Sequence, residues 1–166
     1  MRRAIVILAA ALALAACQKP AKTVADQSAA AKTFMAKNAK EPGVQTLPDG
    51  LQFKVVREGP KDGMRPQLGD EVKVNYEGKL ATNGQIFDSS YARGQPAAMP
   101  LKGLIRGWQE ALTLMRPGDE WILYVPPELG YGAEGAGGGQ IPPGAALVFR
   151  IELIDVLPGP GRVQQG

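Results

Sequence analysis

A chain of 166 residues with 45% hydrophobic and 21% charged side chains is long and apolar enough for one globular domain with its own core. Its net charge is only +3 and it contains no run of Lys or Arg, which argues against nucleic acid as a partner. With no histidine and with Cys17 as its one cysteine, it cannot build a His-dependent catalytic triad, a usual zinc site or an intramolecular disulfide.

Residues 1–16 have the pattern of a secretory signal peptide. Two arginines are followed by an apolar stretch, residues 5–14, that is too short to span a bilayer. The stretch ends in LAAC, which resembles the bacterial lipobox, where the cysteine is acylated and starts the mature chain. We therefore expect a lipid anchor on Cys17 that holds a periplasm-facing lipoprotein in the cell envelope. Gln18 favours the outer membrane over the inner, and the alternative is an ordinary cleavage site with Cys17 incidental.

Residues 17–44 are predicted to contain the lipid-attachment cysteine, a spacer and a short helix. Residues 21–39 are rich in Ala and Lys, have apolar residues at helical spacing and are followed by the helix-breaking pair Pro42-Gly43. The apolar stripe is thin, which favours a solvated spacer between anchor and domain over a dimerisation helix. We expect a monomer, with a weak dimer as the alternative.

Further along the chain the apolar pattern changes to a period of two. In residues 71–80 (EVKVNYEGKL), one face carries Val, Val, Tyr, Gly and Leu, and the other face is charged or polar. This alternation predicts a half-buried antiparallel strand. Similar patterns predict strands at residues 51–56, 121–125 and 147–156.

A single short helix is predicted between these strands. Ile105, Trp108, Leu112 and Met115 recur at helical spacing, and Pro117-Gly118 ends the pattern. The fold class is therefore α+β, an antiparallel sheet with a helix on one face and solvent on the other. The last residues, 158–166, offer little to bury and are expected to be a disordered tail.

Five segments follow one another in the predicted domain: VKVNYEGKLATNGQIFDSS, RGQPAAMPL, LIRGWQEAL, MRPGDEWILYVPPELGYG and IPPGAALVFRIELIDV. In this order and spacing they resemble the FKBP-type peptidyl-prolyl cis/trans isomerases (rotamases). The upstream run PGVQTLPDGLQFKVVREG resembles the macrophage infectivity potentiator-like bacterial subgroup. The resemblance implies an FKBP-like antiparallel sheet of about five strands wrapped around one short helix, preceded by the short N-terminal helix. It places the isomerase domain at residues 45–157.

The resemblance also implies a pocket for a proline ring, with Trp108 as its floor. The implied catalytic residues are Tyr76, Phe87, Asp88, Trp108 and Tyr131, and the implied substrate-binding residues are Arg93, Leu104, Ile105, Ile141 and Phe149. Ala97 stands where many relatives have an aromatic residue, and the glycine-rich residues 133–140 lack the His and paired Ile of eukaryotic relatives. Macrolides of the tacrolimus and rapamycin class bind this family, and Ala97 is expected to weaken that binding by removing contact area.

Rotation about an X-Pro bond needs no nucleophile and no metal, because the barrier of about 18–20 kcal/mol is lost amide resonance. No cofactor and no metal ligand are therefore expected. The uncatalysed step takes tens to hundreds of seconds and can limit folding, so the expected partners are proline-containing unfolded or secreted proteins. An apolar enclosure raises the rate if it binds the twisted transition state better than the planar amide.

Other interpretations use the same residues. Asp88, Ser89 and Ser90 could merely cap a turn, and single aromatic residues could be ordinary core. The glycine-rich segment lacks the Gly-Lys-Ser/Thr ending of a phosphate loop. For the whole protein, the alternatives are a non-catalytic proline-binding chaperone and a structural envelope lipoprotein. The completeness of the pocket set favours an isomerase over both.

Overall fold

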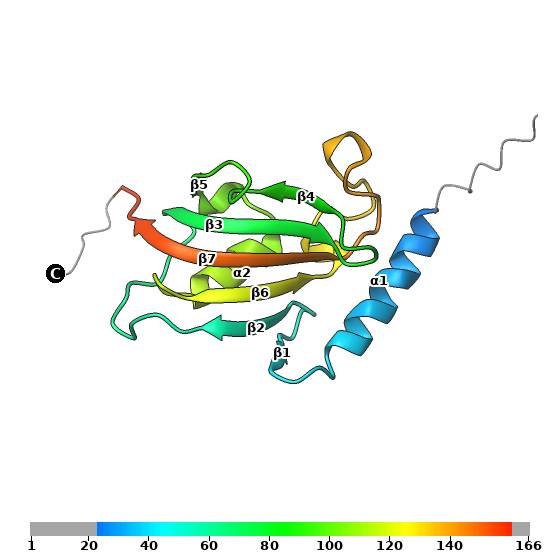
Figure 1. Cartoon of the computed structure of the whole chain (residues 1–166), viewed down its shortest axis with the longest axis horizontal. Helices are drawn as coiled ribbons and strands as arrows, with labels where there is room; N and C mark the ends of the chain where they lie inside the picture. The colour runs from blue at the N-terminus through cyan, green and yellow to red at the C-terminus, as the bar shows by residue number, and fades with distance from the viewer. Residues whose placement is uncertain (1–22, 161–166) are drawn as a thin grey trace, which may run out of the picture.

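The computed structural model describes residues 23–160. The predictions for the signal peptide, for Cys17 and for most of the tail fall outside these residues. Within them, two α-helices and one seven-stranded antiparallel sheet form the domain in Figure 1, which confirms the α+β class. Neither of the two helices is long and apolar enough to cross a membrane.

The sheet has more strands than the roughly five expected. The strands are β1 Val44–Thr46, β2 Gln52–Arg57, β3 Glu71–Leu80, β4 Ile86–Ser89, β5 Ala97–Pro100, β6 Glu120–Val125 and β7 Leu147–Leu157. The four strands predicted from alternation are β2, β3, β6 and β7. The other three are only three or four residues long, and a period of two is not recognisable over so few residues.

The strands lie in the order β1-β2-β6-β7-β3-β4, and β5 pairs with β3 as well. The long strands β3 and β7 are paired from Glu71↔Leu157 to Leu80↔Leu147. The helix α2 (Arg106–Leu114) crosses one face of the sheet. Its residue Leu112 is fully buried in one core with Val74 and Ile151 from the two long strands. Burial of this face is the main favourable contribution to folding.

Short 3-10 helices complete the chain: η1 Leu101–Gly103, η2 Pro127–Leu129 and η3 Gly137–Gly139. The first precedes α2, and the other two lie in the connection from β6 to β7. We call residues 130–146 the site loop, because this segment forms one wall of the cavity described below.

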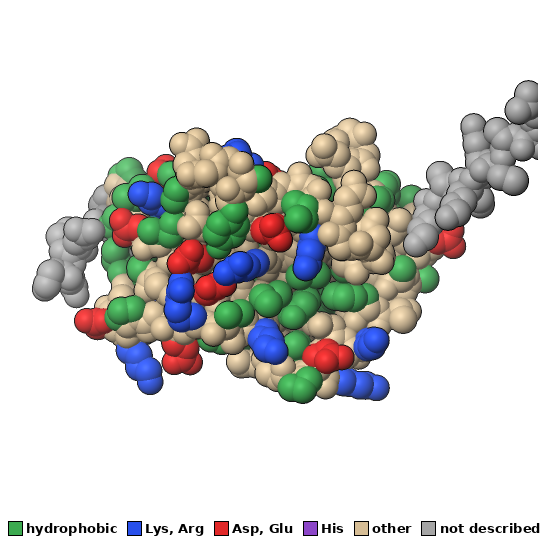
Figure 2. Space-filling model, in the orientation of Figure 1, with side chains coloured by type: hydrophobic (Ala, Val, Ile, Leu, Met, Phe, Trp, Pro, Cys, Tyr) green, Lys and Arg blue, Asp and Glu red, His purple; other side chains and the backbone are tan. Residues whose placement is uncertain are grey.

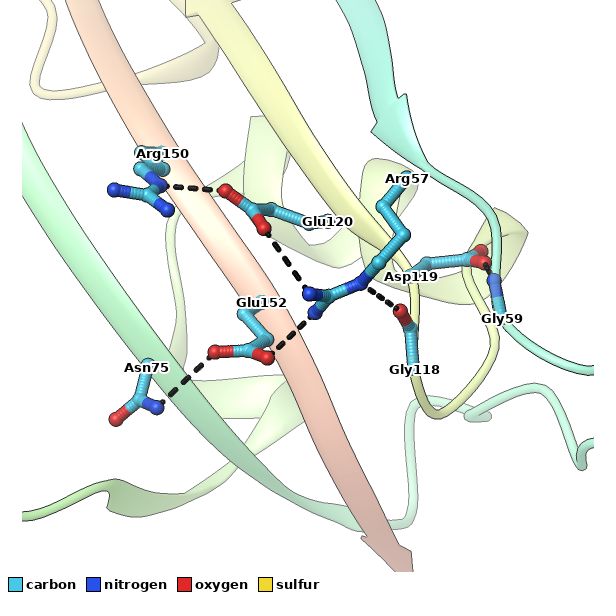
Figure 3. A network of polar contacts seen from close by, with 8 residues as sticks. All are labelled: Arg57, Gly59, Asn75, Gly118, Asp119, Glu120, Arg150 and Glu152. Atoms are coloured by element: carbon cyan, nitrogen blue, oxygen red, sulfur yellow. Dashed lines mark hydrogen bonds and ion pairs between the residues drawn. The ribbon is translucent and has the colours of Figure 1, made fainter.

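Charged side chains gather on the sheet face turned away from α2 (Figure 2). Glu120 on β6 lies directly opposite Glu152 on β7, and like charges in that position repel. Arg57 pairs with both, at 3.6 Å from Glu120 and 2.6 Å from Glu152, and the Arg150 Nε donates to Glu120 at 2.6 Å (Figure 3). The network therefore compensates the charge of Glu120, which is 7% exposed.

The N-terminal helix α1 (Val24–Asn38) begins at a capping box formed by Thr23 and Asp26. Ala31 and Met35 on this helix are buried together with Ala146. The helix is therefore packed on its own domain, and the expectation of a solvated spacer is wrong for these residues. The thin stripe misled because much of the buried face is small or polar and adds little hydrophobic periodicity.

Two carboxyl groups join the turn between β1 and β2 to α2. A hydrogen bond to Asp49, followed by burial and the charge of Asp49, raises the pKa of Glu110 to about 7. The same hydrogen bond lowers the pKa of Asp49, and Arg106 opposes the shift of Glu110. The pair thus holds one shared proton near neutral pH, with Glu110 as the donor.

This pair predicts a pH-dependent stability. Between the usual pKa of Glu110, 4.5, and its raised value of about 7, the folded state keeps a proton that the unfolded state has lost. The free energy of unfolding should therefore fall as pH rises through this window. Thermal unfolding in this pH range should show a falling Tm for the native chain and a flatter profile for Glu110→Gln.

The exposed Glu58→Gln serves as the control and should leave the slope unchanged. Asp88 and Glu152 have lowered pKa values, so their titration affects stability only below this window. An equal slope in the native chain and in Glu110→Gln would contradict the shared proton.

Candidate functional site

A cavity of about 540 Å³ opens between α2, one end of the sheet and the site loop. Nine of the ten predicted pocket residues line it: Tyr76, Phe87, Asp88, Leu104, Ile105, Trp108, Tyr131, Ile141 and Phe149. The same cavity is lined by five residues that were not predicted: Met99, Gly103, Ala136, Gly137 and Gln140. The lining is mainly aromatic and aliphatic, as is usual for a site that binds an apolar group.

Trp108 forms the centre of an aromatic cluster. It lies in the first turn of α2 and is 4% exposed. Its ring meets the ring of Tyr76 edge-on at 5.2 Å and 84°, and the ring of Phe149 at 5.2 Å and 87°. Phe87 in turn meets Phe149 at 5.7 Å and 84°. Perpendicular contacts of this kind hold the indole in one orientation and leave a flat apolar surface in the cavity.

The absence of a side chain at Gly78 allows this cluster to form. Gly78 on β3 lies opposite Phe149 on β7 and opposite Asp88 on β4. A Cβ atom at this position would lie 2.7 Å from atoms of both the Phe87 and the Phe149 ring. Any other residue would therefore push these two rings apart.

One ionic cluster stands at the wall of the cavity. The Tyr76 hydroxyl donates to Asp88 Oδ2 at 2.5 Å, and the Arg93 guanidinium donates to Asp88 Oδ1 and, at 2.9 Å, to the Tyr76 hydroxyl oxygen. Burial alone would raise the pKa of Asp88, but the hydrogen bonds from Tyr76 and Arg93 outweigh it and lower the pKa. Asp88 is therefore an oriented carboxylate at neutral pH. Arg93 does not line the cavity and acts through its two partners.

Turn capping is done by a neighbour of Asp88. The Ser89 hydroxyl accepts a hydrogen bond from the Ala92 N–H at 3.2 Å. The Asp88 carboxylate lines the cavity instead. The interpretation in which Asp88 merely caps a turn therefore does not describe its position.

The site loop supplies the opposite wall through Tyr131 and Ile141. Burial, followed by the charge of Asp88, raises the pKa of Tyr131, so its hydroxyl is a neutral donor at physiological pH. Ala136 and Ile141 exchange two backbone hydrogen bonds of 3.0 and 3.1 Å. The tight turn between them uses residues 137–139, three glycines with positive φ. The glycine-rich segment is thus a closed turn at the rim of the cavity.

Met99, and not Ala97, supplies contact area on the wall formed by β5. Ala97 pairs with Val74 and packs against the core without lining the cavity. Met99 lies two residues further along, on the same face of β5, and does line it. Alternation along the short segment 97–100 would have pointed to Met99, whereas no pattern in the sequence singles out Gln140.

Family models match both parts of the chain. One described as FKBP-type peptidyl-prolyl cis-trans isomerase matches residues 63–154. Another, described as a domain amino terminal to FKBP-type peptidyl-prolyl isomerase, matches residues 4–55.

Individual relatives agree with the family models. The peptidyl-prolyl cis-trans isomerase Mip of Coxiella burnetii is 56% identical over 125 residues, which are 75% of this chain and 53% of that protein. The FKBP-type 22 kDa isomerase of Escherichia coli is 49% identical over 124 residues, 75% of this chain and 58% of that protein. The chain thus spans about half the length of the curated relatives it matches.

Solved structures show the same fold. The crystal structure of FkpA from Escherichia coli has a TM-score of 0.77 and 44% identity, and the match covers 82% of this chain and 62% of that one. A peptidyl-prolyl cis-trans isomerase structure from Pseudomonas syringae has a TM-score of 0.74 and 38% identity, with 86% of this chain and 100% of that one covered.

The close approach at Gly78 predicts a strong effect of one methyl group. Gly78→Ala should force Phe87 and Phe149 apart, which costs about 1–3 kcal/mol through overpacking and lowers Tm by several degrees. The near-UV circular dichroism of the aromatic cluster should change as well. Gly69→Ala is the matched control, because a Cβ there would meet no atom within 4 Å. Equal Tm values and spectra for the two variants would show that the rings have room to spare.

Proposed function

This chain belongs to the FKBP-type peptidyl-prolyl cis-trans isomerase family, and we propose that it catalyses rotation about X-Pro peptide bonds in the cavity over Trp108. The observation that carries the proposal is the aromatic cluster, a rigid apolar enclosure with a single ionic cluster at its wall. Its substrates are proline-containing segments of unfolded or secreted proteins. The same cavity would accept the proline-like ring of tacrolimus-class macrolides.

The proposed mechanism rests on differential binding. As the C–N bond rotates, the amide loses resonance and its carbonyl loses the dipole of the planar form. A dry enclosure therefore binds the twisted state better than the planar, better-hydrated one, and only such a difference raises the rate. Phe87, Ile105 and Phe149 would exclude water, while the proline ring rests on the Trp108 indole.

Two polar groups would position the peptide. The Tyr131 hydroxyl, a neutral donor at the rim, would hold a carbonyl next to the proline. The Asp88 carboxylate, kept ionised and oriented by Tyr76 and Arg93, would face the rotating carbonyl. No proton has to move between enzyme and substrate, so the shifted pKa values serve to fix charge and not to transfer it.

Location and assembly form part of the proposal. The LAAC sequence supports acylation at Cys17 and an anchor in the cell envelope, with the domain facing the periplasm and the outer membrane preferred. Two or more acyl chains would be needed for stable anchoring, because one chain binds a membrane only marginally. The helix α1 buries its apolar stripe against its own domain, which supports a monomer.

The first test is catalysis. A chain that begins at residue 18 should accelerate cis-to-trans conversion of a Leu-Pro tetrapeptide in a chymotrypsin-coupled assay, and chelators should not reduce the rate. Asp88→Ala and Tyr131→Phe should each lower kcat/KM by at least about tenfold, which is about 1.4 kcal/mol of transition-state stabilisation. The fold should persist, since both side chains lie at the edge of the core.

Asp62→Ala and Tyr91→Phe are the matched controls, because both residues are exposed and neither lines the cavity. Their kcat/KM should equal that of the native chain. Equal rates with and without protein would overturn the catalytic proposal and leave a proline-binding chaperone. Native rates in both cavity variants would show that the site lies elsewhere.

The anchor has its own test. Bacterial cells that express the full chain should incorporate labelled palmitate into the protein. Cys17→Ser should abolish this label and leave the precursor uncleaved or the domain soluble in the envelope. Palmitate on the Cys17→Ser protein, or none on the native one, would count against acylation at this residue.

A further inference from the structure

The helix α1 connects two parts of the domain that differ in rigidity. In Figure 1 it runs obliquely past the end of the sheet, with its C-terminal turn beside β1 and β2 and its N-terminal turns beside the site loop. The sheet is held by continuous strand pairing, whereas the site loop is built largely from turns and glycines. A helix that contacts both the sheet and the site loop could restrict the motion of the site loop.

The C-terminal half of α1 is fastened to the sheet. Gln52 on β2 donates to the Met35 backbone oxygen at 2.9 Å and accepts from the Asn38 side chain at 2.8 Å. Both bonds are buried, and Phe34 contacts Tyr124 of β6 with ring centroids 6.2 Å apart. Buried hydrogen bonds are costly to break without a replacement partner, so this end of the helix is fixed.

The N-terminal half of α1 lies directly against the site loop. A Cβ atom on Gly144 would lie 2.5 Å from the Ser28 hydroxyl and 3.1 Å from the Val24 backbone oxygen. Gly144 has a φ of +75°, so the backbone turns here in a conformation that suits glycine and brings it close to the helix. Two residues later, Ala146 is fully buried in a cluster with Ala31.

From this contact the connection to the cavity is short. The Gly144 N–H donates to the Gly132 backbone oxygen at 2.8 Å. Gly132 directly follows Tyr131, and Ile141 lies three residues before Gly144. Tyr131 and Ile141 both line the cavity. A displacement of α1 from Gly144 would therefore release the wall that carries Tyr131 and Ile141.

We propose that α1 is a positioning element for the active site: it braces the Tyr131 and Ile141 wall of the cavity against β2 through its contacts with Gly144 and Ala146. This inference rests on the proposed isomerase function for its consequence in catalysis, but the bracing itself is a property of the fold. In the proposed function the braced wall binds the peptide. Asp88, Tyr76 and Trp108 lie on β4, β3 and α2, which this contact does not hold. Loss of the brace therefore weakens substrate binding more than it slows the rotation step.

Two residues on the buried face of α1, Gln27 and Ala31, allow the contact to be strengthened or weakened by substitution. The Gln27 side chain is buried at the helix face, 8% exposed, and its Oε1 finds no donor among the residues that the structure describes. A buried acceptor without a donor opposes docking. An apolar side chain of similar length at this position should therefore tighten the contact, whereas a charge at Ala31, which is 1% exposed, should break it.

The experiment compares three variants of the chain that begins at residue 18. Ala31→Glu should raise amide hydrogen exchange in residues 131–146 by about tenfold or more, because exchange follows local opening, and should leave β3 and β7 protected. Its KM for the Leu-Pro tetrapeptide should rise by about threefold or more with kcat within about twofold. Gln27→Met should slow exchange in the same segment. Ala29→Glu, which places the same charge on the exposed face of the helix, should match the native chain.

Exchange and kinetics separate this inference from the proposed function. Native exchange of residues 131–146 in Ala31→Glu, or equal effects of Ala31→Glu and Ala29→Glu, would overturn the brace whatever the activity. If Ala31→Glu does not fold, Gln27→Met decides: slower exchange of residues 131–146 supports the inference, and unchanged or faster exchange overturns it. Absence of isomerase activity in the native chain would overturn the proposed function and leave the exchange result to decide on the brace.

Discussion

The pairing of β3 with its neighbours is the constraint on which the cavity depends. β3 pairs with β7 along one side and with β4 and β5 along the other. Its register places Phe149, Gly78 and Asp88 in one row across three strands. Opposed residues of neighbouring strands point to the same face, so this row gathers an aromatic ring, an empty position and a carboxylate where α2 brings in Trp108. A shift of one residue in the register would turn Phe149 away from the helix.

The ionic cluster on the sheet and the one at the cavity differ in what surrounds them. Arg57, Glu120, Arg150 and Glu152 lie on the solvent face of the sheet, where they compensate one another's charges and stabilise the pairing of like-charged positions. Exposed ion pairs of this kind each contribute little to the free energy of unfolding. The cluster around Asp88 lies instead at the wall of the apolar cavity, so its carboxylate faces the cavity and not a neighbouring strand. The same residue types thus stabilise the sheet in one place and orient a carboxylate toward the cavity in the other.

The arrangement of α1 gives the N-terminal segment a structural role inside the domain. Its buried face combines Ala31 and Met35 with the polar Gln27 and Asn38. A face of this composition cannot drive association by hydrophobic area alone. Its docking is nevertheless specific, because Asn38 and the Met35 backbone oxygen both hydrogen-bond to the one side chain of Gln52. This explains why a helix with a thin apolar stripe can still be docked, and it places the helix between the sheet and a wall of the cavity.

The sequence alone determined what local periodicity and family motifs encode. Alternation over six or more residues predicted β2, β3 and β7, and a shorter alternation predicted β6, because one face of each strand is buried. The motifs identified nine residues that line the cavity. Tertiary structure alone decided the short strands β1, β4 and β5, whose pairing comes from their neighbours. It also decided the docking of α1 on Gln52 and Gly144 and the shared proton between Asp49 and Glu110. These features join residues far apart in the chain through single polar or close contacts, and such contacts leave no periodic pattern along the sequence.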